Sequence, residues 1–503
     1  MLSNAPTPLR SKNPDLSAVW FTIGLTGIFL VSLALRFWGI SRFNTLVFDE
    51  VYYARFASHF LKGELIFTGH PPLSTYIVAI GIWIGERLPW GQDGVKNALS
   101  GLLLSPFSYR WLNALTGSFI PLMVGAIAYQ LSNRRSYALI AALLIAADGL
   151  FLVESRYALN NVYLISFGLL GQLCFLLALR TQSWQRWIGL GLAGVGFGAA
   201  AAIKWNGLGF LLGAYALWAA GWILHWIQRI LSKPFNAVPP IALSPLQNLT
   251  QLHLGHILIC FAAIPALTYY VSWFPYMQLD PTNTFWELQL ETLDYHRRVG
   301  GLDAHPYCSL WYTWPLMLRP IAYFYQTAHG IAEPAPVNGP PIPNGAGEII
   351  YDVHAMGNPF LWWLSTAAIL LIIVALAQQL WEQLIAPGKI TDSSGTRSLP
   401  SLTPQTWITL YLTINWAANF LPWIKVTRCV FLYHYMEAFV FAVLALALLV
   451  DRWLHSSHRW HRATGLTVIF AVLIAFAFWM PLYLGLPITP IELRLRRWLP
   501  SWV

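Results

Sequence analysis

Charged residues are scarce in this sequence. Only 10% of its 503 residues are Asp, Glu, Lys or Arg, whereas 57% are hydrophobic. Soluble proteins of ordinary composition carry about 25% charged residues. The low charge therefore excludes an ordinary soluble domain and predicts a polytopic membrane protein whose main solvent is lipid. The 26 tryptophans agree with this class, because indole rings settle at membrane–water boundaries.

Three kinds of motif are missing. No soluble segment carries a basic stripe with interleaved aromatic residues, so the net charge of +9 indicates basic loops against anionic lipid and not nucleic-acid binding. No Cys-x-x-Cys motif occurs, and His296, His305 and His434 lack the spacing of metal ligands, so we predict no metal site. No Ala-x-Ala cleavage site ends the polar stretch 1–16, so the first apolar segment is predicted to be a retained span.

Cysteine is also rare, with four residues in the chain. Cys174 and Cys260 lie inside apolar runs, where a thiol packs as a small apolar group. Cys308 and Cys429 both fall near the predicted outer surface of the protein. A disulfide between these two is one alternative, and two unpaired thiols are the alternative that the sequence favours.

Long apolar runs are abundant. A membrane-spanning helix needs about 20 apolar residues, and this criterion predicts about eleven spans. The predicted spans lie near residues 18–38, 112–131, 137–153, 161–179, 187–203, 207–227, 254–273, 358–380, 405–422, 430–450 and 465–485.

Lysine and arginine in the short connecting loops favour a cytoplasmic N-terminus and an extracytoplasmic C-terminus. This orientation predicts a cytoplasmic tail over 1–17, a single transmembrane domain over 18–485 and an extracytoplasmic tail over 486–503. Two long outer loops, 39–111 and 274–357, belong to the transmembrane domain. Because they hold most of the polar side chains on one side of the membrane, they are the expected places for chemistry.

The first outer loop contains an acidic pair, Asp49 and Glu50, within "NTLVFDEVYYARFASHF". The residues that follow, Val51 to Phe60, predict a short helix that lies in the membrane interface. One interpretation is that the pair caps this helix, whose positive N-terminal end favours carboxylates. The other is that a carboxylate acts as a general base and takes the proton from a hydroxyl nucleophile.

Three isolated cations, Arg110, Arg156 and Lys204, fall near outer span ends. A charge near a span is costly and needs a partner. Each cation either reaches the lipid headgroups along its own stem or joins a cluster that binds an anionic leaving group such as phosphate. Two histidines, His70 and His305, directly precede proline, which favours an extended turn, and a structural role in a loop is the favoured interpretation for both.

These residues also carry a resemblance. The motifs lie in order between about residues 36 and 450, and together they resemble the protein O-mannosyltransferase family. The motifs are the acidic pair, "HPPL", "ESRYALNNVYLISF", "IKWNGL", "HPYCSLWYTWPLMLRP", "GNPFLWW" and "LPWIKVTRCVFLYHYMEAF". The chain looks like a bacterial member, because loop 274–357 has no room for the β-trefoil MIR domain of eukaryotic members.

The resemblance implies an all-α polytopic membrane protein with the GT-C glycosyltransferase fold, in the bacterial inner (plasma) membrane. It implies an inverting transfer of mannose from polyprenyl-phosphate-mannose to serine or threonine hydroxyls of secreted or membrane proteins, at the outer face, without a cofactor. Membrane lipid and the acceptor protein are the implied partners, and an association with the secretion machinery is a further expectation.

The resemblance also implies roles for single residues. Asp49 matches the proposed general base, and Glu50 matches the second acid, which orients the acceptor or the loop. A further set matches positions that bind the donor phosphate or cover the site: Arg110, Arg156, Lys204, His70, His305 and Tyr307. Two motifs depart from the usual form, since "HPPLST" lacks the lysine of "HPPLGK" and "HPYCS" has Cys308 where serine is common.

Two rival functions share some of these features. A transferase that moves aminoarabinose or another lipid-linked sugar to lipid A would have the same fold and an outer acid. A transporter or flippase would have many spans with glycine-interrupted helices and intramembrane charges. The full set of motifs favours the protein O-mannosyltransferase interpretation over the first rival, and the lack of convincing repeated halves disfavours the second.

Overall fold

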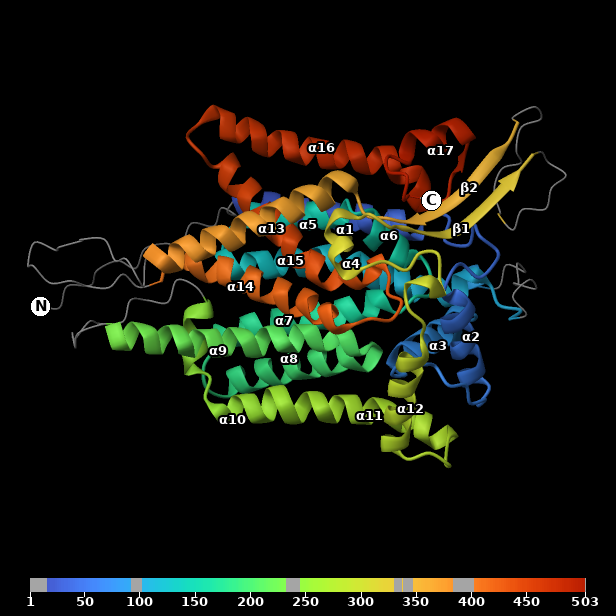
Figure 1. Cartoon of the computed structure of the whole chain (residues 1–503), viewed down its shortest axis with the longest axis horizontal. Helices are drawn as coiled ribbons and strands as arrows, with labels where there is room; N and C mark the ends of the chain where they lie inside the picture. Colours follow the sequence, from blue (N-terminus) through green and yellow to red (C-terminus); the bar gives the residue numbers. More distant parts are fainter. Residues whose placement is uncertain are drawn as a thin grey trace, which may run out of the picture.

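The structure is a computed structural model that describes residues 16–91, 102–231, 245–329, 337, 347–382 and 402–502. Nearly all of the predicted cytoplasmic tail, 1–17, lies outside these residues. Most described residues are helical, in agreement with the prediction (Figure 1). The longer helices run roughly parallel to one another and form a bundle.

The helices of the bundle and its ends have the following bounds: α1 Leu16–Phe37, α2 Glu50–Leu61, α3 Leu73–Gly85, α4 Pro106–Ser132, α5 Arg135–Ala146, α6 Gly149–Arg156, α7 Asn161–Leu179, α8 Ser183–Ile203, α9 Leu208–Leu231, α10 Leu254–His256, α11 Ile264–Leu279, α12 Phe285–Arg298, α13 Pro359–Leu380, α14 Pro404–Phe420, α15 Met436–Leu454, α16 Arg459–Leu484 and α17 Pro490–Arg496. A stretch of π-helix, Ile257–Ala263, joins α10 to α11.

Each predicted span coincides with a helix or a broken helix. Within the described residues, nine helices are long and apolar enough to cross a membrane, or ten if the bent pair α5–α6 counts as one span. The remaining predicted span, 405–422, corresponds to α14. This helix has 17 residues, whereas the shortest of the nine spanning helices, α7, has 19. The number eleven therefore stays a prediction, because length and composition alone support nine or ten.

The break between α5 and α6 has a polar cause. The two helices meet at 62°, and Asp148 stands between them. Its carboxylate accepts hydrogen bonds from the Phe151 amide at 3.0 Å, the Asn358 amide at 3.1 Å and the Trp362 indole at 2.8 Å. Because Asp148 satisfies amides at the starts of both α6 and α13, it fixes the bend and ties the two helices together.

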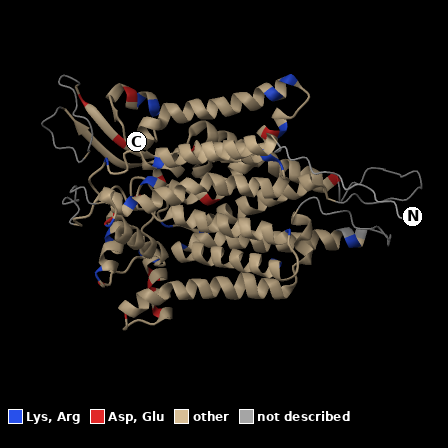
Figure 2. Cartoon of the chain, turned by 180° about the vertical axis from the view of Figure 1, so that it is seen from behind, with Lys and Arg blue, Asp and Glu red and all other residues tan. Residues whose placement is uncertain are grey.

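Helix α15 lies at the centre of the bundle, because 94% of the residues in its most apolar stretch are buried. In α1 the same share is 6%, so α1 lies at the periphery. Figure 2 shows that charged residues gather at the two ends of the bundle and are almost absent between them. A membrane-spanning protein is expected to have this distribution, because an unpaired charge in the middle of the bilayer is costly.

Within the described residues, a small antiparallel sheet departs from the predicted all-α fold. Strands β1 Ile321–Ala328 and β2 Ile349–Ala355 form a hairpin within loop 274–357, and β3 Pro487–Ile488 adds to β2. The predicted C-terminal tail is therefore folded, as β3 and α17. Gly485 makes this possible, because its φ of +60° is left-handed and a Cβ there would lie 2.4 Å from the Phe43 ring.

The two predicted outer loops meet at one end of the bundle. Helices α2 and α3 come from loop 39–111, and α12, β1 and β2 come from loop 274–357. All of them, together with α17, lie at the end of the bundle drawn on the right of Figure 1. The elements of the two loops thus lie at the same end of the bundle, and the side of the membrane on which they lie stays a prediction.

Candidate active site

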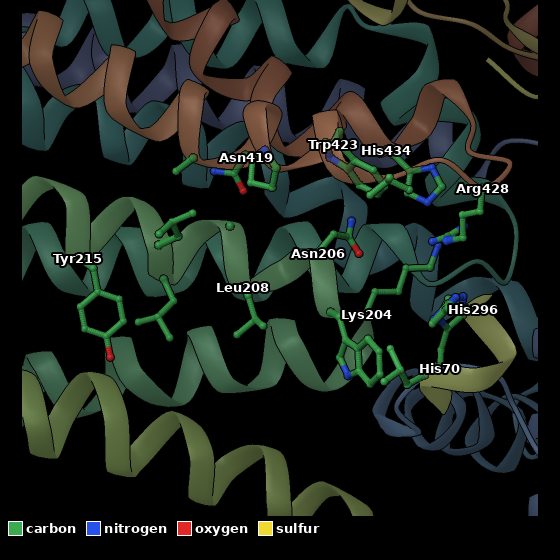
Figure 3. Close-up of a pocket in the computed structure, with 18 residues that line it drawn as sticks. His70, Lys204, Asn206, Leu208, Tyr215, His296, Asn419, Trp423, Arg428 and His434 are labelled. Atoms are coloured by element: carbon green, nitrogen blue, oxygen red, sulfur yellow. The ribbon is translucent and has the colours of Figure 1, made fainter. Parts of the chain in front are cut away.

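Two adjoining cavities lie where these loops cover the bundle. The larger has a volume of about 600 Å³ and the smaller about 320 Å³. Five side chains line both cavities and mark their junction: His70, Lys204, His296, Arg428 and His434. The two cavities therefore form one continuous site with a cationic junction, part of which is seen at the right of Figure 3.

The larger cavity is a groove with apolar walls between α9 and α14. Leu208, Leu212 and Tyr215 of α9 line it on one side, and Ala418 and Asn419 of α14 line it on the other. Figure 3 shows Leu208, Tyr215 and Asn419 extending away from Lys204 and Arg428. Leu208 and Leu212 are also 48% and 46% exposed on the surface of the bundle. The groove therefore connects the cationic junction with the apolar surface that faces lipid.

The smaller cavity holds Asp49, the only carboxylate among the described residues that lines either cavity. No described residue donates a hydrogen bond to its side chain, although Asp49 occupies the N-cap position of α2. Burial raises the pKa of Asp49 to about 6, and the nearby charge of Lys204 acts in the opposite direction. A half-buried carboxylate with this pKa is mostly ionised at pH 7 and free to accept a proton, as a general base must be.

Glu50, the other predicted acid, is an anchor. It is buried and lines neither cavity. Its carboxylate accepts two hydrogen bonds from the Arg110 guanidinium, at 2.8 and 2.7 Å, and one each from the Val47 and Ala158 amides at 2.8 Å. Each of its two carboxylate oxygens accepts two hydrogen bonds. Glu50 therefore fixes the start of α2 and with it the position of Asp49.

Arg110 completes this anchor. Its three remaining N–H groups donate to the backbone carbonyls of Ile40, Phe43 and Thr45, at distances between 2.8 and 3.0 Å. With two hydrogen bonds to Glu50 as well, all five donors of the guanidinium are satisfied inside the protein. The structure therefore gives no support to the expected phosphate role of Arg110, because none of its donors is left for a ligand.

Arg156 also turns away from both cavities. One of its terminal nitrogens donates to the carbonyls of Leu35, Arg36 and Trp38, at 2.6, 3.2 and 2.8 Å. These carbonyls belong to the last turn of α1 and the residue after it, where a helix lacks intrahelical partners and its dipole favours a cation. Arg156 is thus a C-terminal cap of α1, and a phosphate role receives no support from its placement.

Lys204 lies in the junction of the cavities, and its expected phosphate role stays a prediction. It lies between α8 and α9, and its ammonium donates to the Asn161 side chain at 3.0 Å and lies 5.0 Å from the centre of the Tyr433 ring. Burial lowers the pKa of Lys204 to about 8, while the charges of Asp49 and Glu154 oppose that shift. At pH 7 the side chain is therefore mostly protonated and provides a fixed positive charge beside Asp49.

Arg428 is the second cation of the junction, and it was not among the residues predicted from the sequence. It lies in an irregular segment between two short 3₁₀ helices, Leu421–Lys425 and Leu432–Tyr435. Burial lowers the pKa of Arg428 from its ordinary value, and an arginine guanidinium as a rule keeps its charge in proteins. Arg428 lies inside the "VTRCVFLYHY" motif, which was noticed in the sequence. No rule of residue spacing distinguished Arg428 from the other cations as a site residue.

Neutral histidines surround the two cations. Burial and the nearby Lys204 hold the pKa of His70 well below its usual range, and burial and Arg428 lower the pKa of His296 to about 4. The two rings lie 5.0 Å apart. Both side chains are therefore neutral hydrogen-bonding groups at pH 7, suited to hydroxyl or phosphate oxygens. Among the described residues, no group of three His, Cys, Asp or Glu side chains is arranged to hold a metal ion.

The segment with "HPY" forms part of the wall. His305 lines the smaller cavity, whereas Tyr307 does not. Tyr307 packs under the Arg319 guanidinium at 5.7 Å, and Arg319 donates to the Pro306 carbonyl at 2.8 Å. Tyr307 therefore helps to hold the loop that carries His305.

A disulfide joins Cys308 to Cys429. The sequence favoured two unpaired thiols, and this prediction is wrong. The fold brings two segments 121 residues apart into contact, so the two cysteines can pair.

A series of hydrogen-bonded side chains that ends at Lys204 was also not predicted. The Tyr323 hydroxyl donates to Glu154, Asn161 donates to the other Glu154 oxygen at 3.1 Å, and Lys204 donates to Asn161. The Tyr323 ring stacks on Phe48 at 4.1 Å. Phe48 has a strained φ of +52°, and it directly precedes Asp49. The sheet is thereby linked to both Asp49 and Lys204.

This geometry defines a class. Asp49, Lys204 and Arg428 line one small cavity, and an apolar groove leads from the two cations to the exposed apolar surface of the bundle. A carboxylate, two cations and an apolar groove in this arrangement suit a membrane enzyme for group transfer from a lipid-linked donor.

Comparison with known families agrees with this class. Residues 26–278 match the family described as dolichyl-phosphate-mannose-protein mannosyltransferase, and residues 281–502 match the C-terminal four-transmembrane region of protein-O-mannosyltransferase. The chain belongs to this family of membrane mannosyltransferases, as the motifs predicted.

Two bacterial relatives match along nearly their whole length. The polyprenol-phosphate-mannose–protein mannosyltransferase of Mycolicibacterium smegmatis is 25% identical, over 91% of this chain and 88% of the relative. The protein of the same name from Corynebacterium glutamicum is also 25% identical, over 99% of this chain and 96% of the relative.

A solved structure shows the same fold. The chain superimposes on the Saccharomyces cerevisiae protein O-mannosyltransferase Pmt1–Pmt2 complex bound to the sugar donor with a TM-score of 0.72 and 13% identity, over 99% of this chain and 96% of that one. The predicted GT-C fold is thus confirmed.

Proposed function

We propose that this protein transfers mannose from polyprenyl-phosphate-mannose to serine or threonine hydroxyls of secreted or membrane proteins, with inversion, at the outer face of the bacterial inner membrane. The observation that carries the proposal is that Asp49 lines the smaller cavity together with Lys204 and Arg428, the two cations of the junction. The names of the mycobacterial and corynebacterial relatives support mannose and a polyprenyl phosphate as the donor.

In the proposed reaction, the acceptor hydroxyl enters the smaller cavity and Asp49 removes its proton. The hydroxyl oxygen forms a bond to the anomeric carbon while the bond from that carbon to the phosphate oxygen breaks on the opposite side. The electron pair of the broken bond leaves with polyprenyl phosphate. The proton then passes from Asp49 to solvent or to the departing phosphate, which restores the base.

Lys204 and Arg428 stabilise the charge that grows on the leaving phosphate. Their positions are fixed before the reaction, and such preorganised charges contribute strongly to catalysis in a site shielded from water. The neutral side chains of His70 and His296 donate or accept hydrogen bonds to sugar and phosphate oxygens. In this proposal the two cations supply all of the positive charge, and no cofactor takes part.

The apolar groove between α9 and α14 takes the polyprenyl chain. Its walls include Leu208 and Leu212, which are also exposed on the lipid-facing surface, so a lipid tail can enter from the side without leaving an apolar environment. The smaller cavity, of about 320 Å³, admits an extended segment of the acceptor and not a folded domain. An association with the secretion machinery, which delivers unfolded chains, belongs to the proposal for this reason.

The disulfide supports an extracytoplasmic site. Disulfides form and persist in oxidising compartments and are rare in the cytosol. Cys429 lines the smaller cavity, so the wall of the site belongs to the oxidising side of the membrane in this proposal. The same assignment follows from the lysines and arginines of the short loops.

Transfer by the purified protein tests the proposal. The protein is incubated with polyprenyl-phosphate-mannose and a peptide rich in serine and threonine, and the peptide is analysed by mass spectrometry. We expect one hexose at a hydroxyl residue and no transfer by Asp49→Asn. A matched reaction with polyprenyl-phosphate-glucose tests the sugar, and lipid A in place of peptide tests the rival acceptor. Modification of lipid A alone would contradict the proposal.

The side of the membrane is tested with sealed vesicles of known orientation. A peptide added outside is expected to be modified by right-side-out vesicles and not by inverted ones. Modification only by inverted vesicles would place the site in the cytoplasm and would contradict the proposed orientation.

A further inference from the structure

The cavity wall that carries Arg428 is joined to the "HPY" loop by the Cys308–Cys429 disulfide. Cys429 lines the smaller cavity itself, its neighbour Arg428 lines both cavities, and His305 lies three residues before Cys308. We propose that this disulfide positions Arg428 for the donor phosphate, so that donor binding depends on the oxidised state of the cysteine pair. This inference rests on the function proposed above.

The backbone around Arg428 has no regular secondary structure. The residues from 426 to 431 form neither helix nor strand. Two backbone hydrogen bonds join this segment to the opposite loop, from the Cys429 amide to the Gly300 carbonyl at 2.7 Å and from the Ser309 amide to the Val430 carbonyl at 2.9 Å. Both hydrogen bonds lie beside the disulfide, so the disulfide and these two hydrogen bonds together join the two segments.

The side chain of Arg428 makes few contacts within the part of the chain that the structure describes. Among the described residues, its guanidinium donates one hydrogen bond, to the carbonyl of the adjacent Cys429 at 3.0 Å. Arg110 offers the contrast, because all five of its donors are satisfied by Glu50 and three backbone carbonyls. Arg428 thus has donors left for an anionic ligand, and its position depends on its own backbone.

The other cation of the site is independent of the disulfide. Lys204 lies between α8 and α9 and is tied to Asn161 of α7. Asp49 is held by the Glu50–Arg110 anchor at the start of α2. Opening the disulfide therefore displaces one phosphate ligand and leaves the base and the second cation in place. The expected effect is weaker donor binding and a lower kcat, with an unchanged KM for the peptide, because Arg428 contacts the donor phosphate and not the acceptor.

The experiment compares oxidised and reduced wild-type protein. Dithiothreitol gives two electrons and two protons to the disulfide, yielding two thiols on the protein and the cyclic disulfide of the reagent, and mass spectrometry after alkylation verifies the reduction. The double variant Cys308→Ala/Cys429→Ala gives the same state without reagent. Cys174→Ala, a free cysteine of α7, is the matched control.

We expect the KM for the donor to rise about tenfold in the reduced protein and in the double variant, the effect of losing one charge-assisted contact. The KM for the peptide should stay within about twofold, whereas kcat should fall, because Arg428 also stabilises the charge that grows on the leaving phosphate. Cys174→Ala should match wild type in all three quantities. Adding Arg428→Ala to the double variant should weaken donor binding no further than Arg428→Ala alone, because the disulfide acts through Arg428.

A donor KM that stays within about twofold of wild type after complete reduction would overturn the inference. A uniform loss in all parameters, or fully additive effects of Arg428→Ala and the cysteine changes, would show a merely structural disulfide. Binding of polyprenyl phosphate, followed by tryptophan fluorescence on the same samples, repeats the comparison without transfer. An oxidised protein that binds this lipid but transfers no mannose would refute the proposed function and still decide the role of the disulfide.

Discussion

The substitution Glu50→Gln separates the two members of the acidic pair. The Glu50 carboxylate accepts four hydrogen bonds, two from Arg110 and one each from the Val47 and Ala158 amides. Glutamine has nearly the same shape but no charge and a single acceptor oxygen. The Arg110 guanidinium would then be left in a buried site without its counterion.

The magnitude follows from this loss. Removing one partner of a buried ion pair costs about 3–5 kcal/mol. The free energy of unfolding should therefore fall by about that amount in Glu50→Gln, a large part of the total stability of most proteins. Glu64→Gln is the control, because the Glu64 side chain is 53% exposed beside His59 and its loss should cost under about 1 kcal/mol.

The assay measures both stability and chemistry. Unfolding is followed in mixed micelles as denaturing detergent increases, and kcat is determined per folded molecule. We expect lower stability and a kcat reduced far less than the roughly 10²–10⁴-fold loss of a general base. The double variant with Arg110→Gln should cost less than the sum of the two single variants. Unchanged stability with a loss of that size in kcat would refute the anchor role and place Glu50 in the proton transfer.

Three further predictions concern the cations and the pH dependence. The profile of kcat/KM should be bell-shaped: it falls below a pKa of about 6, as Asp49 becomes protonated, and above about 8, as Lys204 loses its charge; a flat profile down to pH 5 would remove Asp49 from the base role. Lys204→Met should raise the donor KM and lower kcat by at least about tenfold, since the charge also stabilises the leaving phosphate, and an unchanged donor KM would exclude that contact. Arg156→Met should lower the melting temperature and leave the donor KM unchanged, because Arg156 caps α1, and weaker donor binding without lower stability would contradict that cap.

Part of the site could be predicted because its residues carry local signals. An acidic pair that opens an aromatic, amphipathic segment predicts both a short helix and a charged group at its start, and α2 with Asp49 at its N-cap confirms that helix. The apolar runs likewise located the helices of the bundle, and the two long polar loops do share one end. These features depend on neighbours in the sequence.

The partners of Arg110 and Arg156 could not be predicted, because they are distant in the sequence. Arg110 bonds to Glu50, 60 residues away, and Arg156 bonds to carbonyls of α1, up to 121 residues away. Backbone carbonyls carry no sequence signal at all. An isolated cation near a span thus has the same appearance whether it binds a ligand or caps a helix.

The sheet escaped prediction for a different reason. Strands β1 and β2 have eight and seven residues, and a search for runs of about 20 apolar residues does not register segments of that length. The disulfide was disfavoured because nothing in the sequence indicates that the segments of Cys308 and Cys429 meet. Two cysteines pair only when the fold brings their Cα atoms to within about 7 Å.

The most direct test of the proposed mechanism compares turnover and donor binding in Asp49→Asn. The proposal predicts that kcat falls by about 10²–10⁴-fold or below detection, while the affinity for polyprenyl-phosphate-mannose and the melting temperature stay close to those of wild type. Near-normal turnover by Asp49→Asn would contradict the assignment of Asp49 as the base on which the whole mechanism depends.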